Sequence, residues 1–244
     1  MRRARQVIGR AGIWNRSSRF ARMERTAAVE SGPATSTGRP AVELRGLRRD
    51  FGDRTALAGV SARLEPGESM AVLGRNGSGK STLLRILAGL LRPSGGEATV
   101  LGISLPKETH RIRGRVGYLG HAPLLYRDLN PRENLALVAA LHGLDPEDAG
   151  QRIETLLEAV GMSARGDDRV AELSAGMKQR VDICRAILHE PELLLLDEPD
   201  AHLDTDARGL VEPLIGPGTG ASRVVVSHDR EAATAGADLV LELG

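Results

Sequence analysis

The 244-residue sequence has few aromatic residues, one cysteine and no long apolar run. Aromatics make up 2% of the chain, so the core must be built from Leu, Val, Ile and Ala. The single cysteine, Cys184, excludes an intrachain disulfide, and its place among apolar residues at helical spacing favours a buried thiol. No apolar run approaches the roughly 18 residues that a membrane span needs, so any membrane role would act through a partner.

Neither positive nor negative charge is in large excess, because the formal net charge is only +1. This balance gives no general attraction to nucleic acid or anionic lipid. The distribution is uneven, however, since residues 1–25 contain eight arginines and one acid. We predict that residues 1–39 form a disordered basic tail ahead of a domain at 40–244. A transit segment and a true start at Met23 are the alternatives.

Short apolar segments on both sides of a helical block predict the strands of an α/β domain. They are expected at 41–47, 55–64, 70–73, 97–105, 115–119, 193–196, 223–226 and 239–243. Residues 48–52 are predicted to be a turn, and Gly102 is predicted to turn the strand at 97–105. Asn130 and Asp145, each followed by Pro and Glu, predict two helix starts within a helical block at about 121–188.

One stretch fits the phosphate-binding pattern G-x-x-x-x-G-K-[ST]. It comprises Gly74, Arg75, Asn76, Gly77, Ser78, Gly79, Lys80, Ser81 and Thr82. An apolar strand precedes it and an apolar pattern of helical spacing follows, so backbone N–H groups and a helix N-terminus would face a phosphate. Lys80 would reach the β- and γ-phosphates, and the Ser81 hydroxyl would hold Mg²⁺. The flanking patterns favour this site over a glycine-rich turn without a ligand.

Two carboxylates follow the most continuous apolar strand of the sequence. The four leucines at 193–196 are typical of a strand buried on both faces, and Asp197 and Glu198 come directly after them. Ligands bind at the carboxyl ends of strands in open α/β sheets, so Asp197 would face Mg²⁺ and Glu198 would activate a water. Acids at a strand end are common in ordinary turns, but here the phosphate loop supplies the other half of a Mg–nucleotide site.

A third motif, Leu173-Ser174-Ala175-Gly176-Met177, opens a predicted helix before Asp197. With the two sites above, it resembles the signature of the nucleotide-binding subunits of ABC transporters, over residues 41 to 244. The resemblance implies a P-loop NTPase with a RecA-like mixed-sheet core, an antiparallel β subdomain and an inserted helical subdomain. It also implies a homodimer around two ATP molecules, in which Ser174 and Gly176 of one subunit face the phosphate loop of the other.

The same resemblance implies roles for four further residues. Phe51 matches the aromatic residue that stacks on adenine, although a core phenylalanine beside a turn is the alternative. Asp204 matches a loop that contacts the other subunit, and His228 matches a histidine that contacts the γ-phosphate. His121 stands where the family has a glutamine that touches Mg²⁺ and relays to the membrane subunits. Ala175 and Met177 are further departures, because the family has Gly and Gln there.

The implied function is ATP hydrolysis coupled to transport through separate permease subunits, at the cytoplasmic face of the membrane and without nucleic acid. The sequence Tyr118-Leu119-Gly120-His121, with Ala175 in the signature, resembles the ATPase of the haem exporter used in cytochrome c maturation. The alternatives are an ATPase of a drug or polysaccharide exporter, a soluble ATPase of iron–sulfur assembly, and a soluble ATPase acting on nucleic acid or ribosomes. Neither tandem cassettes nor an excess of basic residues supports the last of these.

Overall fold

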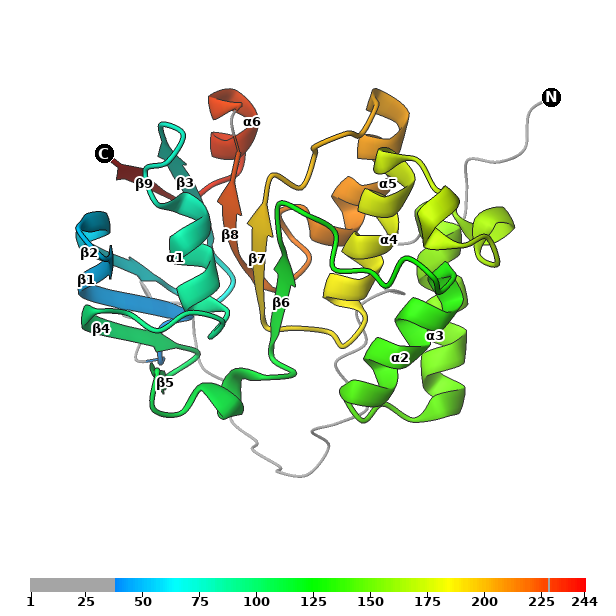
Figure 1. Ribbon diagram of the computed structural model, residues 1–244, viewed down its shortest axis with the longest axis horizontal. Coiled ribbons are helices and arrows are strands. Elements are labelled where there is room, and N and C mark those ends of the chain that lie inside the picture. Colours follow the sequence, from blue (N-terminus) through cyan, green and yellow to red (C-terminus); the bar gives the residue numbers. More distant parts are fainter. Residues whose placement is uncertain (1–37, 228) are drawn as a thin grey trace, which may run out of the picture. The chain divides into compact units, whose positions relative to one another are not determined.

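The computed structural model describes residues 38–227 and 229–244 (Figure 1). The prediction of a tail over 1–39 therefore lies outside the described residues except for Gly38 and Arg39, and the prediction for His228 lies outside them altogether.

A five-stranded sheet forms the centre of the described domain (Figure 1). Its strands, in spatial order, are β6 (Val116–Leu119), β7 (Leu193–Asp197), β8 (Ser222–Val226), β3 (Ser69–Gly74) and β9 (Leu239–Leu243). All four pairings are parallel, and β7 and β8 are buried along their whole length. The four leucines of β7 and the three valines of β8 match the apolar sequence that burial on both faces requires.

A separate four-stranded sheet carries the antiparallel pairings. Its strands, in spatial order, are β2 (Arg54–Leu64), β1 (Val42–Phe51), β4 (Gly95–Val100) and β5 (Ile103–Leu105). Helix α1 (Lys80–Leu87) buries four apolar side chains in one core that includes residues of both sheets: Leu83, Leu84, Ile86 and Leu87. The phosphate loop is therefore built between two sheets that share a hydrophobic core.

Helices fill the predicted block between β6 and β7 and follow each of the last two buried strands (Figure 1). They are α2 (Pro131–Leu141), α3 (Pro146–Ala159) and α4 (Ala175–Ile187) in the block, with 3₁₀ turns η2 (Ser163–Arg165) and η3 (Val170–Glu172), and then α5 (Thr205–Ile215) and α6 (Arg230–Thr234). Another 3₁₀ turn, η1 (Thr109–Ile112), comes before β6. The predicted helix starts are confirmed. Asn130 and Glu133 form a reciprocal capping box, and the Asp145 carboxylate accepts from the Glu147 and Asp148 N–H groups.

The predicted turn over residues 48–52 is wrong, because β1 continues to Phe51. The chain reverses one step later, and Phe51 pairs directly with Arg54 across Gly52, which has φ 57°. The polar residues that indicated a turn instead pair on the exposed face of the sheet. Arg48 lies 2.8 Å from Asp50, and the Thr55 hydroxyl donates to Asp50 at 2.7 Å. Charged pairs on an exposed sheet face are compatible with a strand.

Two stacked histidines join the helical block to the central sheet. The rings of His142, at the end of α2, and His189, after α4, are 4.0 Å apart and nearly parallel. The His189 Nε2–H donates to the Val116 carbonyl of β6 at 3.1 Å, which fixes the neutral tautomer because a carbonyl can only accept. Burial, with smaller contributions from His142, Arg185 and Arg152, lowers the pKa of His189 to about 3. Burial, with Arg185, also lowers the pKa of His142.

This burial predicts an acid-sensitive junction. The unfolded chain takes up a proton on His189 below the ordinary histidine pKa of 6.5, whereas the folded chain does so only near 3. The free energy of unfolding should therefore fall as pH drops through this window, by about 3 kcal/mol at pH 4 from this residue. His189→Gln, which keeps a donor for the Val116 carbonyl, should flatten this part of the profile in urea unfolding measured from pH 7 to pH 4.

His110→Gln is the matched control, because it replaces an exposed imidazole. Wild type and His110→Gln should share one profile, from which His189→Gln departs below pH 6.5. Identical profiles for all three proteins would show that His189 is not a source of the acid sensitivity.

Candidate functional site

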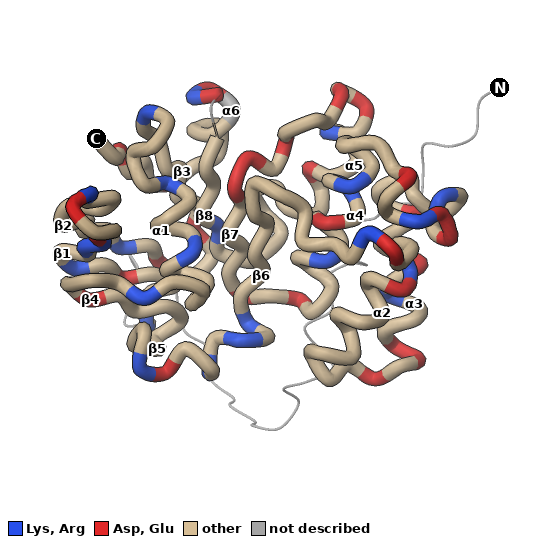
Figure 2. The backbone as a smooth tube through the Cα atoms, in the orientation of Figure 1, with Lys and Arg blue, Asp and Glu red and all other residues tan. Residues whose placement is uncertain are grey.

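The motif residues gather at one edge of the central sheet. Because β3, β7 and β8 run parallel, their carboxyl ends meet there. Gly74 ends β3, Asp197 ends β7, and Ser227 follows β8. Figure 2 shows the acidic residues at the end of β7 on the same side of the sheet as the start of α1. The fold thus brings together the two carboxylates and the phosphate loop, which are more than 100 residues apart in sequence.

The phosphate loop needs glycine where the backbone of β2 comes closest. Gly79 is the N-cap of α1 with φ 98°, and a Cβ there would lie 2.2 Å from the Ala56 carbonyl oxygen. Gly77 also has positive φ, 81°, but a Cβ there would meet only the end of the Arg54 side chain, at 3.1 Å. Backbone atoms cannot move aside as a flexible side chain can. Gly79 is therefore the more constrained of the two glycines.

The side chains of the loop are arranged around Lys80. Lys80 is buried, and its Nζ donates to the carbonyls of Gly74 at 2.7 Å and Arg75 at 3.1 Å. Arg54 donates to the Gly77 carbonyl at 3.1 Å from the adjacent hairpin. The Ser78 hydroxyl is buried and has no hydrogen-bond partner among the described residues. Ser81 and Thr82 lie in the first turn of α1, half-buried, and Asn76 is exposed.

Asp197 and Glu198 differ in their surroundings. Asp197 is 2% exposed, and its Oδ2 is buried without a hydrogen-bond partner in the described structure. Glu198 has φ 56°, a left-handed conformation that is costly for a residue with a Cβ, and its N–H donates to the Val226 carbonyl at 2.8 Å. This conformation turns the chain away from β7 directly after Asp197.

His121 lies beside Glu198 in the connection from β6 to α2. Its Nδ1 is 3.9 Å from Glu198 Oε2, and its side chain is 70% exposed, compared with 19% for Glu198. The connection is anchored further along, where the Leu124 N–H donates to Asp182 at 3.1 Å. Asp182 also accepts from Arg185 at 2.5 Å, and burial raises the pKa of Asp182.

The Tyr126 backbone is held at both its N–H and its carbonyl by the buried Asn134 of α2. The segment between His121 and α2 is thus fixed to α4 and α2, although it has no regular secondary structure.

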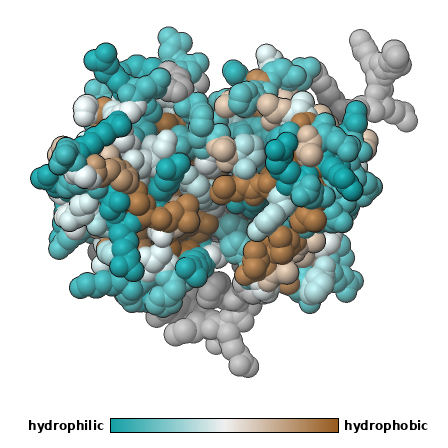
Figure 3. Space-filling model, in the orientation of Figure 1, coloured by the Kyte–Doolittle hydropathy of each residue, from teal (hydrophilic) through white to brown (hydrophobic). Residues whose placement is uncertain are grey.

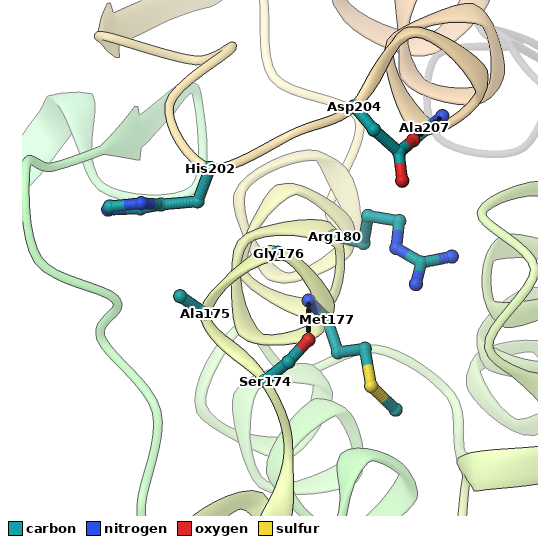
Figure 4. A pocket seen from close by; sticks show the side chains of 8 residues that line it. All are labelled: Ser174, Ala175, Gly176, Met177, Arg180, His202, Asp204 and Ala207. Atoms are coloured by element: carbon teal, nitrogen blue, oxygen red, sulfur yellow. Dashed lines mark hydrogen bonds between the residues drawn. The ribbon is translucent and has the colours of Figure 1, made fainter.

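The signature residues line a different pocket, of about 400 Å³, at the start of α4 (Figure 4). Ser174 caps α4 by accepting from the Met177 N–H at 3.2 Å, and its side chain is exposed. Gly176 lies against the next loop, because a Cβ there would be 2.6 Å from the His202 carbonyl oxygen. Asp204 caps α5 through the Ala207 N–H at 2.8 Å. Residues of the phosphate loop do not line this pocket.

Three residues of the site region were not predicted from the sequence. Gln179, buried in α4, donates to the Pro199 carbonyl at 3.1 Å and so joins the signature helix to the loop after Glu198. His202, with φ 64°, lines the signature pocket, and Arg54 contacts the phosphate loop. Each contact joins segments distant in sequence, so no local pattern indicates it. The one partial signal is the residue type of His202, because histidine adopts a positive φ more often than most residues with a Cβ.

A family model described as "ABC transporter" matches residues 57–201, which is more than half of the chain. The daunorubicin resistance ATP-binding protein DrrA3 of Streptomyces coeruleorubidus is 38% identical over 183 residues, covering 73% of this chain and 58% of that protein. The Nod factor export ATP-binding protein I of Rhizobium sp. (strain N33) is 36% identical over 171 residues, covering 70% and 56%. The chain thus spans little more than half the length of these relatives.

Solved structures agree with the fold. An ATP-binding subunit of an ABC transporter superposes with a TM-score of 0.76 at 31% identity, covering 83% of this chain and 85% of that one. A dimeric, post-hydrolysis ATP-binding cassette with bound ADP and phosphate superposes with a TM-score of 0.75 at 27% identity, covering 83% and 94%. These likenesses confirm the predicted P-loop ATPase fold with an antiparallel sheet and a helical block, and the core that was predicted as a mixed sheet has parallel pairings throughout its described strands. The chain therefore belongs to the ABC transporter family and carries an ABC ATPase domain.

Proposed function

We propose that this protein binds and hydrolyses ATP as the energy-supplying subunit of an ABC exporter. One observation carries the proposal: the phosphate loop, Asp197 and Glu198 lie at one edge of a single parallel sheet. A phosphate chain held by the loop would therefore extend toward two carboxylates suited to metal binding and proton transfer.

Phosphate binding would use the backbone N–H groups of the loop and the N-terminus of α1. Lys80 supplies the positive charge. Its ammonium group donates to the Gly74 and Arg75 carbonyls in this structure, and it would donate instead to the β- and γ-phosphate oxygens of ATP. Because Lys80 is buried, this charge is poorly screened by solvent and contributes strongly to binding.

The residues at this edge suit Mg²⁺. The Ser81 hydroxyl and the Asp197 carboxylate are hard oxygen donors, and Asp197 Oδ2 is buried without another partner. When bound, Mg²⁺ would neutralise charge on the β- and γ-phosphates.

Hydrolysis would depend on Glu198 and His228. Glu198 follows the strand end and is partly buried, so its carboxylate can orient a water and accept its proton. His121, 3.9 Å from Glu198, would report nucleotide state to the connection that it begins, in place of the family's glutamine. His228 comes two residues after the last residue of β8 in the sequence, and we assign it contact with the γ-phosphate.

The site would be completed by a second copy. The exposed Ser174 hydroxyl and the N-terminus of α4 face a pocket open to an incoming anion, and Gly176 permits close approach (Figure 4). Within one chain, no phosphate-loop residue lines this pocket. Two chains arranged head to tail would place each loop against the other's signature, with Asp204 between them.

Membrane permease subunits are the proposed partners, at the cytoplasmic face of the membrane and without nucleic acid. No helix among the described residues is long and apolar enough to span a bilayer. Large apolar side chains are exposed near His121, with Leu124 at 52% and Tyr126 at 63%, and Leu141 at the end of α2 at 76%. Figure 3 shows apolar side chains gathered on this face of the molecule. Such exposure is typical of a protein-binding surface.

The exported substrate belongs to the proposal as well. The relatives described above are named for daunorubicin resistance and Nod factor export, which favours export of an organic molecule of this kind. Haem export is the second candidate, supported only by Tyr118-Leu119-Gly120-His121 and Ala175. The proteins that co-purify with this chain would distinguish export from iron–sulfur assembly. An exporter ATPase should co-purify with membrane subunits, whereas an assembly ATPase should co-purify with a soluble cluster scaffold.

Lys80→Ala tests the phosphate loop. Loss of the buried ammonium group should weaken ATP binding at least 100-fold, since charge-assisted bonds to phosphate contribute about 1.5–3 kcal/mol each. Isothermal titration with ATP measures the change, and Lys107→Ala, at an exposed lysine, is the control. Equal affinity of wild type and Lys80→Ala for ATP would show that the phosphate loop is not the ATP-binding site.

Glu198→Gln tests the hydrolytic role. The amide is nearly isosteric with the carboxylate but cannot accept the proton of water, so turnover should fall at least 100-fold while ATP binding persists. The variant should then accumulate as an ATP-bound dimer in light scattering. Glu158→Gln, at an exposed residue of α3, should behave as wild type. Hydrolysis at the wild-type rate by Glu198→Gln would show that another residue is the general base.

A further inference from the structure

The ring of Phe51 is covered on one side by a charged group. The guanidinium carbon of Arg49 lies 4.4 Å from the centre of the Phe51 ring, within the range of a cation–π interaction. The two residues are two apart on β1, so their side chains leave the same face of the sheet. Phe51 is nevertheless 46% exposed, which leaves part of the ring open to a ligand.

Arg49 is held in this position by the segment that follows α1. Its Nη1 donates to the Arg92 carbonyl, 3.0 Å away, in the segment that follows α1. Two more bonds tie β1 to the same segment: the Ser94 N–H donates to the Arg48 carbonyl at 2.8 Å, and the Asp50 N–H to the Ser94 hydroxyl at 3.0 Å. Within the part of the chain that the structure describes, Arg49 Nε is buried without a hydrogen-bond partner, a cost that the remaining contacts of the guanidinium must offset.

The hairpin that carries Phe51 is also tied to the phosphate loop. Phe51 pairs with Arg54 across the turn, and Arg54 donates to the Gly77 carbonyl at 3.1 Å. The ring and the loop therefore belong to one hydrogen-bonded assembly, whose relative spacing is set before any nucleotide arrives. Preorganisation of this kind improves affinity by reducing the ordering that binding requires.

We propose that Arg49 is a positioning residue for the nucleotide base, holding the Phe51 ring from one side so that adenine stacks on the other. This inference rests on the proposed function, in which Phe51 binds the base of ATP. The guanidinium fixes the ring plane and attracts its π electrons, and the purine completes a three-layer stack of guanidinium, phenyl ring and base. Arg49 acts on the nucleotide only through Phe51.

The test compares two ligands. ATP carries base and phosphates, whereas inorganic tripolyphosphate carries only the phosphates and probes the loop alone. Arg49→Ala should weaken ATP binding about two- to five-fold, because the ring loses the restraint of its cation–π contact and must then be ordered when the base binds, and should leave tripolyphosphate binding unchanged. Arg49→Lys keeps the positive charge and should recover most of the loss. In steady-state hydrolysis, Arg49→Ala should raise KM for ATP and leave kcat unaltered.

A double-mutant cycle with Phe51→Ala tests whether Arg49 acts through the ring. Arg49→Ala should have no further effect on ATP affinity once Phe51 is gone. The inference is overturned if Arg49→Ala binds ATP as wild type does, if it weakens ATP and tripolyphosphate equally, or if the two substitutions are additive. Thermal unfolding identifies a variant that does not fold, in which case Arg49→Lys and Arg49→Met carry the comparison.

Failure of the proposed function gives a different result. If Phe51→Ala leaves ATP affinity unchanged, the base does not stack on Phe51 and the assumption itself is wrong. If wild type binds neither ATP nor tripolyphosphate, the phosphate loop is not the nucleotide site. An effect of Phe51→Ala without an effect of Arg49→Ala, by contrast, rejects the role of Arg49 and keeps that of the ring.

Discussion

The close approach of the phosphate loop to the antiparallel sheet is the constraint on which the site depends. At Gly79 the loop passes so near the Ala56 carbonyl that no Cβ fits, and the same residue starts α1 with φ 98°. The α1 side chains then bury between both sheets. One backbone contact therefore couples the phosphate-binding turn, the nucleotide helix and the hairpin that carries Phe51. Substitution at Gly79 would have to separate two backbones that the shared core holds together.

The signature is built in the same way as the phosphate loop, because another segment of backbone closely approaches the N-terminus of its helix. Ser174 caps α4 and Gly176 allows the His202 carbonyl to lie against its first turn. Gln179 ties this helix to the segment after Glu198, so a direct hydrogen bond links the signature helix to the chain beside the carboxylates. The phosphate loop and the signature do not share a pocket, and this separation is why we infer a second copy.

The sequence predicted those features that depend on local chemistry. The phosphate loop, the apolar strand before Asp197 and the caps at Asn130 and Asp145 each need particular residues at fixed spacing. It failed where tertiary contacts override local preference. Residues 48–51 extend β1 because they pair with residues 54–58 of β2. Helix α5 includes Gly209 and Pro213, which weaken any helical pattern. The stack of His142 on His189 joins segments that are distant in sequence, and the guanidinium over Phe51 requires β1 to continue through residues that the sequence assigned to a turn.

The central claim is that each ATP is held between the phosphate loop of one chain and the signature of another. Mixing two inactive variants tests it most directly: Lys80→Ala, with a damaged loop, and Ser174→Arg, with a blocked signature. In mixed dimers, the intact loop of the second variant meets the intact signature of the first. We predict that the equimolar mixture hydrolyses ATP although neither variant does so alone. A mixture as inactive as its components, with mixed dimers demonstrated, would contradict the account.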